Sequence, residues 1–267
     1  MATVVLVHGS WLAAWCWQKV TSQLEARGHR AIAVDLPGHG PDAQRAAEIR
    51  FDDYVEAVGG VIQRCEEPPL LVVHSWGGIA LSVAEAWPNR LQALVLIAAA
   101  VPPSGSPMMR VVEQYDPSFP ATLIFSADQR LVSITAEGAR EFLFGRTRAQ
   151  DADAAVARLT PEPVAPFDTP IVTTAERFGR VPRFYVETTA DRLVPIALQQ
   201  AIQARIGCRR VVTLDADHAP FLSAPDALAA GLDDIAVEMS SADATPRERI
   251  DRTRDRTYSG RARPADL

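Results

Sequence analysis

Hydrophobic residues of this chain gather in short unbroken runs, and most runs are followed by a stretch with the apolar spacing of a helix. Such runs are typical of strands buried on both faces of a parallel sheet. They predict strands at residues 3–7, 31–34, 70–73, 94–101, 183–187 and 210–214. Helices are predicted in alternation with them, at residues 15–27, 51–65, 77–87, 195–206 and 225–237. The alternation indicates an α/β protein whose mostly parallel sheet carries helices on both faces.

The alternation stops at about residue 104 and returns after residue 180. The intervening stretch holds many prolines and short apolar clusters, with helices expected near residues 135–144 and 151–159. An insertion that is apolar yet irregular is best interpreted as a helical cap, or lid, over the strand ends. An ordinary helical subdomain with no role at the site is the alternative.

Residues 70–78, L-L-V-V-H-S-W-G-G, predict a strand that breaks into a helix across one serine. Such a nucleophile elbow pushes the Ser75 side chain out at the carboxyl end of the sheet, and turns the backbone N–H of Trp76 toward the same spot as an oxyanion donor. The alternative is a serine that only caps the following helix. Val73 stands where the G-x-S-x-G pattern has its first glycine, which predicts slightly wider packing of strand against helix.

A serine nucleophile needs a base, and a carboxylate that holds the base in the right tautomer. His218 follows the last predicted strand, and it completes the chain order serine, acid, histidine. Asp191 follows the preceding strand and is the expected acid, with a helix-preceding acid or a salt-bridge partner as the alternative. Glu187 lies inside its strand, and Asp215 and Asp217 are too close to His218 in sequence to reach its far ring nitrogen comfortably.

The other four histidines are not expected to transfer protons. His74 adjoins the serine, but its side chain should point away, so a structural role is expected. His8 and His39 lie in loops near the site, where scaffolding is the favoured role. His29 lies in the polar sequence R-G-H-R and is expected to be solvated.

Composition narrows the function classes. A chain of 267 residues with 48% hydrophobic content can build one large α/β domain. Its net charge of -6 provides no general attraction to nucleic acid or to an anionic membrane. No apolar run reaches the roughly 18 residues of a membrane span. Three cysteines without C-x-x-C spacing, and no leader-like segment before residue 3, predict a reduced, cytoplasmic protein.

The end of the chain differs from the rest. Residues 240–267 carry seven arginines and five acidic residues with few aliphatics, so they cannot bury enough surface to fold alone. We therefore expect one domain at residues 1–239, with the cap inserted at about residues 104–180, followed by an Arg-rich, disordered tail. A net charge of +2 makes nucleic-acid binding by this tail a weak hypothesis.

Six motifs lie in register over about residues 3–239: H-G-S-W-L-A-A-W-C-W, D-L-P-G-H-G, H-S-W-G-G, E-R-F-G-R-V-P-R-F-Y-V-E, D-R-L-V-P and D-H-A-P-F-L-S-A-P. Together they resemble the α/β-hydrolase superfamily, and more narrowly its branch of plant methylesterases, hydroxynitrile lyases and related small bacterial esterases. The resemblance implies an α/β-hydrolase fold with a helical cap. It implies Ser75 as nucleophile, His218 as base and Asp191 as the acid that orients the base. It also implies backbone N–H groups of Ser10 and Trp76 as the oxyanion hole.

The leading function is hydrolysis of a small or medium carboxylic ester with an apolar group, through an acyl-enzyme that needs no metal or organic cofactor. The alternative is a hydroxynitrile-lyase-like enzyme on the same triad. Members of the lyase branch typically carry Thr and Lys at the positions of Gly9 and Ala219, so these two residues favour the esterase. A slow-hydrolysing ligand-binding protein is a third hypothesis. The expected partner is a small-molecule ester, with no nucleic acid and no membrane, and a homodimer is left open.

Overall fold

Six parallel strands form the centre of the molecule, in the order β2-β1-β3-β4-β8-β9. The computed structural model describes residues 1–243. The predicted mostly parallel α/β sheet is confirmed, and each predicted strand is present within one residue of its expected start. The strands are β1 (Thr3–Val7), β2 (Arg30–Val34), β3 (Leu70–Trp76), β4 (Ala93–Ala100), β8 (Arg183–Thr188) and β9 (Arg210–Leu214).

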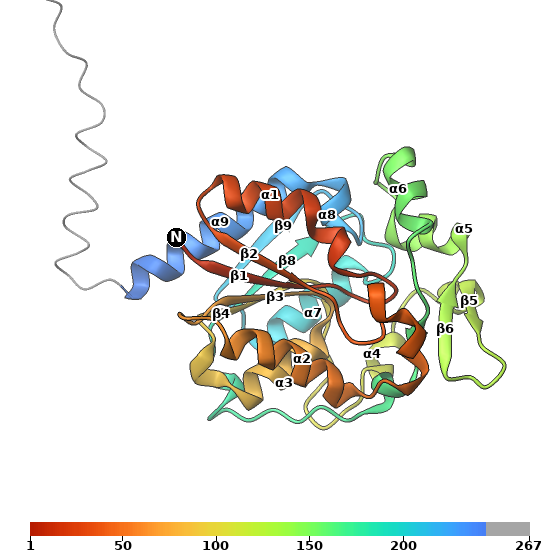
Figure 1. The fold of residues 1–267 in the computed structure, drawn as a ribbon, viewed down its shortest axis with the longest axis horizontal. Helices are drawn as coiled ribbons and strands as arrows, with labels where there is room; N and C mark the ends of the chain where they lie inside the picture. Colours follow the sequence, from red (N-terminus) through yellow and green to blue (C-terminus); the bar gives the residue numbers. More distant parts are fainter. Residues whose placement is uncertain (244–267) are drawn as a thin grey trace, which may run out of the picture.

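Helices cover both faces of this sheet (Figure 1). In β1 the side chains alternate between two buried clusters, as the two-residue repeat of a strand requires. Val4 and Leu6 pack toward α1 and α9, whereas Val5 and Val7 pack toward α2, α3 and α7. These helices are α1 (Gln18–Ala26), α2 (Phe51–Gln63), α3 (Gly77–Ala86), α7 (Ile196–Ile206) and α9 (Pro225–Asp243). Burial on both faces explains why the strand sequences are unbroken apolar runs.

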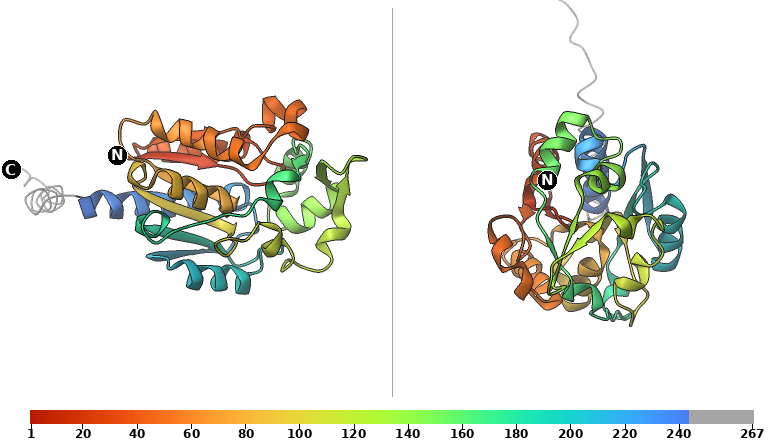
Figure 2. Two further views of the ribbon diagram at one scale, coloured as in Figure 1. Left: turned by 90° about the horizontal axis from the view of Figure 1, so that it is seen from below. Right: turned by 90° about the vertical axis from the view of Figure 1, so that its right-hand side faces the viewer.

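Most of the segment between β4 and β8 forms a layer at the carboxyl edge of the sheet (Figure 2). Its last part returns along α3, where the backbone N–H groups of Thr174 and Phe178 donate to Glu85. We call residues 104–180 the cap segment. It contains the helices that were predicted, now bounded as α5 (Ala136–Gly138) with the π-helical turn Ala139–Leu143, and α6 (Ala149–Val156). It also contains α4 (Met109–Val112). A small antiparallel sheet, β5-β6-β7, was not predicted. Its strands are β5 (Leu123–Phe125), β6 (Leu131–Ile134) and β7 (Glu162–Pro163), which are too short to show a periodic pattern.

The ends of several other elements differ from expectation. The predicted helix at residues 15–27 begins with the 3-10 turn Ala14–Trp17, and a second 3-10 segment, Gly40–Glu48, follows a loop after β2. A short helix, α8 (Pro220–Ser223), precedes α9. Helix α9 continues to Asp243, so the expected tail boundary at residue 240 falls inside a helix. The rest of the predicted tail, residues 244–267, lies outside the described residues.

The expectation that His29 is solvated is wrong. Its side chain is buried, and its Nε2 lies 2.7 Å from Oδ1 of Asp233 in α9. The cause is long-range packing, because α9 lies against α1 and brings Asp233 to the turn that leads into β2. Among residues 1–243, no helix combines the length and hydrophobicity needed to cross a membrane.

Helix α2 approaches α3 closely at Gly59. A Cβ atom at this position would lie 2.2 Å from the ring of Trp87, which directly follows α3. The neighbouring Gly60 has room, because its Cβ would meet only the flexible Arg64 side chain, at 3.4 Å. The packing of α2 therefore requires a glycine at position 59 but not at position 60.

We expect Gly59→Ala to lower the free energy of unfolding by about 1–3 kcal/mol, because overpacking must displace an indole ring. Gly60→Ala serves as the matched control and should raise it by roughly 0.5–1 kcal/mol, because alanine has the higher helix propensity. Urea denaturation of both variants checks the pair. Equal effects from the two substitutions would contradict the close contact at Gly59.

Candidate active site

Ser75 lies at the end of β3 with a left-handed backbone, at φ +58°. This conformation costs a residue other than glycine about 1–2 kcal/mol, so the surrounding packing must enforce it. Glycines make room for the turn, since a Cβ at Gly9 would lie 2.7 Å from the Ser75 Cβ. A Cβ at Gly77 would lie 2.5 Å from the Ala100 carbonyl oxygen. The chain thus makes the sharp strand-to-helix turn that the elbow motif predicts.

Val73, the departure from G-x-S-x-G, is fully buried inside the strand ladder. It pairs in register with Val7 of β1 and Leu96 of β4. The irregularity in the β3–β4 pairing lies later, between His74 and Trp76. The elbow therefore begins after Val73, and the wider packing expected from this residue stays a prediction.

The structure brings Ser75, His218 and Asp191 together. His218 Nε2 lies 3.0 Å from Ser75 Oγ, and His218 Nδ1 lies 2.8 Å from Asp191 Oδ2. His218 comes from the loop after β9 and Asp191 from the loop after β8, and both are buried. With Nδ1–H donating to the carboxylate, Nε2 is available to accept the Ser75 hydroxyl proton.

The carboxylate of Asp191 is surrounded by donors. Its Oδ1 accepts hydrogen bonds from the backbone N–H groups of Leu193, at 2.8 Å, and Val194, at 2.9 Å. Its Oδ2 accepts from the Thr188 hydroxyl at 3.2 Å, in addition to His218. Because a carboxylate only accepts, this set of donors holds it in one orientation.

The other acids considered from the sequence bond elsewhere. Glu187 accepts from the Gln203 amide and from the Thr213 hydroxyl, both at 2.8 Å. Asp215 is largely exposed. Asp217 is buried and accepts from the backbone N–H groups of Arg146 and Ala219, at 2.8 and 3.0 Å. Asp217 thus ties the turn that carries the histidine to the cap segment, a role the sequence did not suggest.

The neighbouring histidines are buried and hold backbone groups. His74 Nε2 lies 2.6 Å from the carbonyl oxygen of His218, and burial lowers the His74 pKa well below its usual value. His8 Nε2 accepts from the Leu36 N–H at 3.1 Å, and burial lowers the His8 pKa to about 3. Burial likewise lowers the pKa of His39 to about 4. As neutral rings they suit the structural roles expected of them.

Two buried polar side chains near the site escaped prediction. Gln199 of α7 binds the backbone N–H and carbonyl of Thr188, both at 3.1 Å, and thereby braces the loop that carries Asp191. Glu162 of β7 is fully buried and contacts Trp11 and Trp76. Neither carries a local sequence signal, because a glutamine in a helix and a glutamate before a proline look like surface residues.

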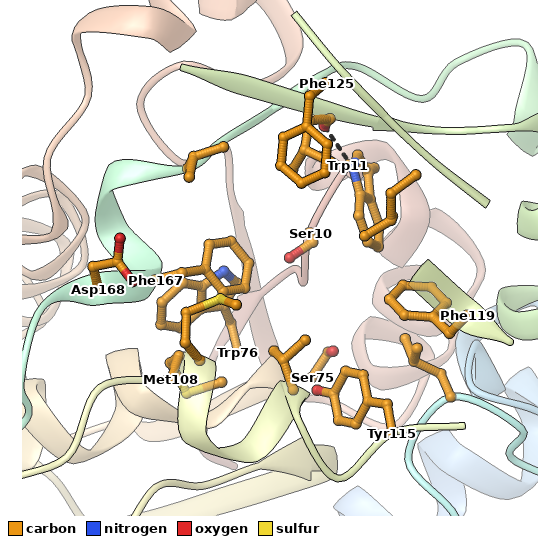
Figure 3. A pocket seen from close by; sticks show the side chains of 16 residues that line it. Ser10, Trp11, Ser75, Trp76, Met108, Tyr115, Phe119, Phe125, Phe167 and Asp168 are labelled. Carbon is orange, nitrogen blue, oxygen red and sulfur yellow. Dashed lines mark hydrogen bonds between the residues drawn. The ribbon is translucent and has the colours of Figure 1, made fainter. Parts of the chain in front are cut away.

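A cavity of about 160 Å³ opens beside Ser75 (Figure 3). Ser10 and Trp76 line it, and the Tyr115 hydroxyl points toward Ser75. Its other walls are mostly apolar and come largely from the cap segment: Trp11, Met108, Met109, Val112, Phe119, Leu123, Phe125, Val132, Val164, Phe167 and Leu193. Asp168, which is exposed, is the charged member of the lining. The cavity therefore suits an uncharged, apolar group.

No cluster of three or more histidine, cysteine, aspartate or glutamate side chains within residues 1–243 could hold a metal ion. The site combines a hydroxyl, an imidazole and a carboxylate in line, at the wall of an apolar cavity. Such a set can form and break an acyl-oxygen bond.

Comparisons with known proteins identify the family and the fold. A family model described as the alpha/beta hydrolase family matches residues 4–231. Methylesterase 7 of Arabidopsis thaliana is 31% identical over 250 residues, which cover 87% of this chain and 95% of that protein. A pyrethroid hydrolase of Sphingobium wenxiniae is 29% identical over 252 residues, or 87% of each chain. The crystal structure of polyneuridine aldehyde esterase matches with a TM-score of 0.81 at 26% identity, covering 88% of this chain and 99% of that one.

The left-handed backbone of Ser75 leads to a stability prediction. Ser75→Gly should be more stable than Ser75→Ala by about 1 kcal/mol, because only glycine adopts this conformation without strain. Both variants lack the hydroxyl, so their difference isolates the backbone. At Ser82, inside α3, we expect the reverse order, with alanine more stable by roughly 0.5–1 kcal/mol. Thermal melts of the four variants measure both differences, and the same order at both sites would contradict strain at Ser75.

Proposed function

The chain belongs to the alpha/beta hydrolase family, and we propose that it hydrolyses carboxylic esters that carry an apolar group, with Ser75 as the nucleophile. The observation that carries the proposal is the hydrogen-bonded series Ser75–His218–Asp191 at the wall of an apolar cavity. Relatives named as a methylesterase and a pyrethroid hydrolase support an ester as the substrate class.

In the proposed reaction, Ser75 Oγ attacks the ester carbonyl carbon while His218 Nε2 takes the hydroxyl proton. The tetrahedral intermediate collapses, His218 returns the proton to the alcohol oxygen, and the alcohol leaves an acyl-enzyme on Ser75. Water then attacks the acyl carbon with His218 again as base, which releases the acid and restores Ser75. Asp191 keeps His218 in the tautomer that accepts at Nε2, and it stabilises the imidazolium that forms.

We propose the backbone N–H groups of Ser10 and Trp76 as the donors for the oxyanion. Both residues line the same cavity as Ser75, and Trp76 directly follows the left-handed turn. Removing one such donor typically costs about 10²–10³ in kcat, because the donors are aligned before charge develops.

The cap segment contributes most of the apolar wall, so we propose that it selects the acyl or alcohol group. Met108, Phe119 and Phe125 offer large uncharged surfaces to this group. Burying an apolar substrate group stabilises the complex by about 0.8 kcal/mol per methylene until the cavity is full. Esters with medium-sized apolar groups should therefore react with higher kcat/KM than acetates.

Two features argue against a lyase on the same residues. A departing anion such as cyanide is best stabilised by a buried cation beside the base, and Ala219 is buried and uncharged. A hydroxyl-bearing side chain at Gly9 has no room, because its Cβ would lie 2.7 Å from the Ser75 Cβ. An acyl-enzyme route needs neither group.

The first functional prediction concerns Ser75 and the reaction type. The native chain should hydrolyse p-nitrophenyl esters and methyl esters, and it should release no cyanide from mandelonitrile above background. Ser75→Ala should lower kcat by about 10⁶-fold, because the members of such a triad act as a unit. Serine-directed phosphonates should label Ser75 in the native chain, as intact mass and peptide mapping would detect.

Ester turnover that persists in Ser75→Ala at a near-native rate would overturn the mechanism. Cyanide release that Ser75→Ala abolishes would instead decide for a lyase. Tight ester binding with negligible turnover in the native chain would identify a ligand-binding protein.

The second functional prediction concerns the acid. Asp191→Asn should retain the fold and lower kcat by about 10⁴-fold, because an amide N–H facing His218 Nδ1 favours the wrong tautomer. Asp215→Asn is the matched control, and it should leave kcat within about twofold because its side chain is mostly exposed. Steady-state kinetics on one p-nitrophenyl ester compare the two. A severe loss in Asp215→Asn with little change in Asp191→Asn would reverse the assignment.

A further inference from the structure

A fully buried carboxylate lies behind the proposed oxyanion hole. Glu162, on β7 of the cap segment, is 0% exposed. Its Oε2 accepts a hydrogen bond from the Trp11 backbone N–H at 3.1 Å, and its Oε1 accepts from the Trp76 indole N–H at 3.3 Å. The Ser10 hydroxyl also acts on this carboxylate, as a donor that lowers the Glu162 pKa. One side chain thus contacts both segments that present a backbone donor to the cavity.

The first of these segments needs such support because its backbone is strained. Trp11 has φ +64°, in the left-handed region that costs a tryptophan about 1–2 kcal/mol. Three hydrogen bonds from the cap segment hold Trp11 in place. Glu162 accepts its backbone N–H, Thr160 N–H donates to its carbonyl at 3.0 Å, and its indole N–H donates to the Val132 carbonyl at 2.9 Å. Holding Trp11 and the Ser10 side chain restrains the loop that carries the Ser10 N–H.

The second segment is held through its side chain. The Trp76 indole packs against Phe51, Tyr54 and Phe167, with ring centroids 4.7–6.3 Å apart. Ring packing holds the indole plane, and the bond from its N–H to Glu162 Oε1 sets the direction of its polar edge. The backbone N–H of the same residue is the proposed donor beside Ser75.

The donors around Glu162 require a side chain that accepts several hydrogen bonds at once. Trp11, Trp76 and Ser10 all present donors to Glu162, and the Tyr54 hydroxyl donates from 3.4 Å. His39 Nε2 lies 3.4 Å away, and burial lowers its pKa to about 4. Burial raises the pKa of Glu162 to about 7, against the effect of these hydrogen bonds. At pH 8 Glu162 is therefore mainly an ionised carboxylate, and both of its oxygens accept. A glutamine would carry an NH2 group in place of one oxygen, and this group would face a donor.

We propose that Glu162 is a positioning residue that aligns the two oxyanion donors, by binding the Ser10–Trp11 loop and the Trp76 indole at the same time. This inference rests on the proposed function. Glu162 touches no substrate and transfers no proton. Its effect reaches the reaction only through the direction of the two backbone N–H groups.

The test compares Glu162→Gln and Glu162→Ala with the native chain at pH 8. Because misaligned donors weaken binding of the transition state more than of the substrate, kcat for a p-nitrophenyl ester should fall about 10- to 100-fold while KM changes less than about threefold. The glutamine variant retains one acceptor, so it should lose less than the alanine variant. Glu137→Gln, an exposed glutamate of the cap segment, is the matched control and should keep native kinetics.

Two ketone inhibitors distinguish an effect of Glu162 on the alignment of the oxyanion donors from an effect on the shape of the cavity. A trifluoromethyl ketone forms a hemiketal oxyanion on Ser75, whereas the methyl ketone of the same skeleton only fills the cavity. Glu162→Gln should weaken the trifluoromethyl ketone by the same factor as kcat and leave the Kd of the methyl ketone within about threefold. Should Glu162→Ala fail to fold, Trp76→Phe provides the second variant, since it removes the indole N–H and keeps an aromatic ring. It should lower kcat less than additively when combined with Glu162→Gln.

Native kcat and native trifluoromethyl ketone affinity in Glu162→Gln would overturn the inference while leaving the proposed function intact. Equal weakening of both ketones would also overturn it, because Glu162 would then shape the cavity and not the donors. Absence of Ser75-dependent ester hydrolysis in the native chain would overturn the proposed function and this inference together.

Discussion

The left-handed backbone of Ser75 is the constraint on which the rest of the site depends. The turn exposes the side chain to the cavity only because glycines at positions 9 and 77 leave space for it. Its strain is tolerated because β3 is a central strand, buried between β1 and β4, where burial of the apolar residues on both faces outweighs about 1–2 kcal/mol. A strand near the edge of the sheet would hold the same turn less firmly.

The parallel sheet then brings the remaining groups to Ser75. Asp191 and His218 follow β8 and β9, whose carboxyl ends lie on the same edge of the sheet as that of β3. Each group has its own brace: Gln199 bonds to the loop beside Asp191, and His74 holds the His218 carbonyl. The hydrogen-bonded series therefore joins Ser75 and His218, which are 143 positions apart in the chain. Neither residue depends on a long flexible loop to reach the other.

The cap segment is bonded to the site as well as covering it. Glu162 and Thr160 bind the Trp11 backbone, and Asp217 accepts from the backbone N–H of Arg146 in the cap segment. Both the loop that contains Ser10 and the turn that contains His218 are thus attached to the cap. Moving the whole cap away would break buried hydrogen bonds, each costing about 1–3 kcal/mol when a polar group is left unpaired. Under the proposed function, substrate selection and the alignment of the site therefore depend on the same segment.

The sequence by itself determined the sheet, its helices and the three residues that meet at its edge. Apolar runs encode buried strands locally, and a parallel sheet places a serine, an acid and a histidine that each follow a strand on the same edge. Only the tertiary structure decided what surrounds these residues. Glu162 meets Trp11 from 151 positions away, and His29 is covered by a helix 204 positions later. The three-stranded cap sheet likewise forms from strands too short to repeat a pattern. Partners that are distant in the chain leave no periodic signal, because burial of a polar group depends on which elements pack together and not on its neighbours in sequence.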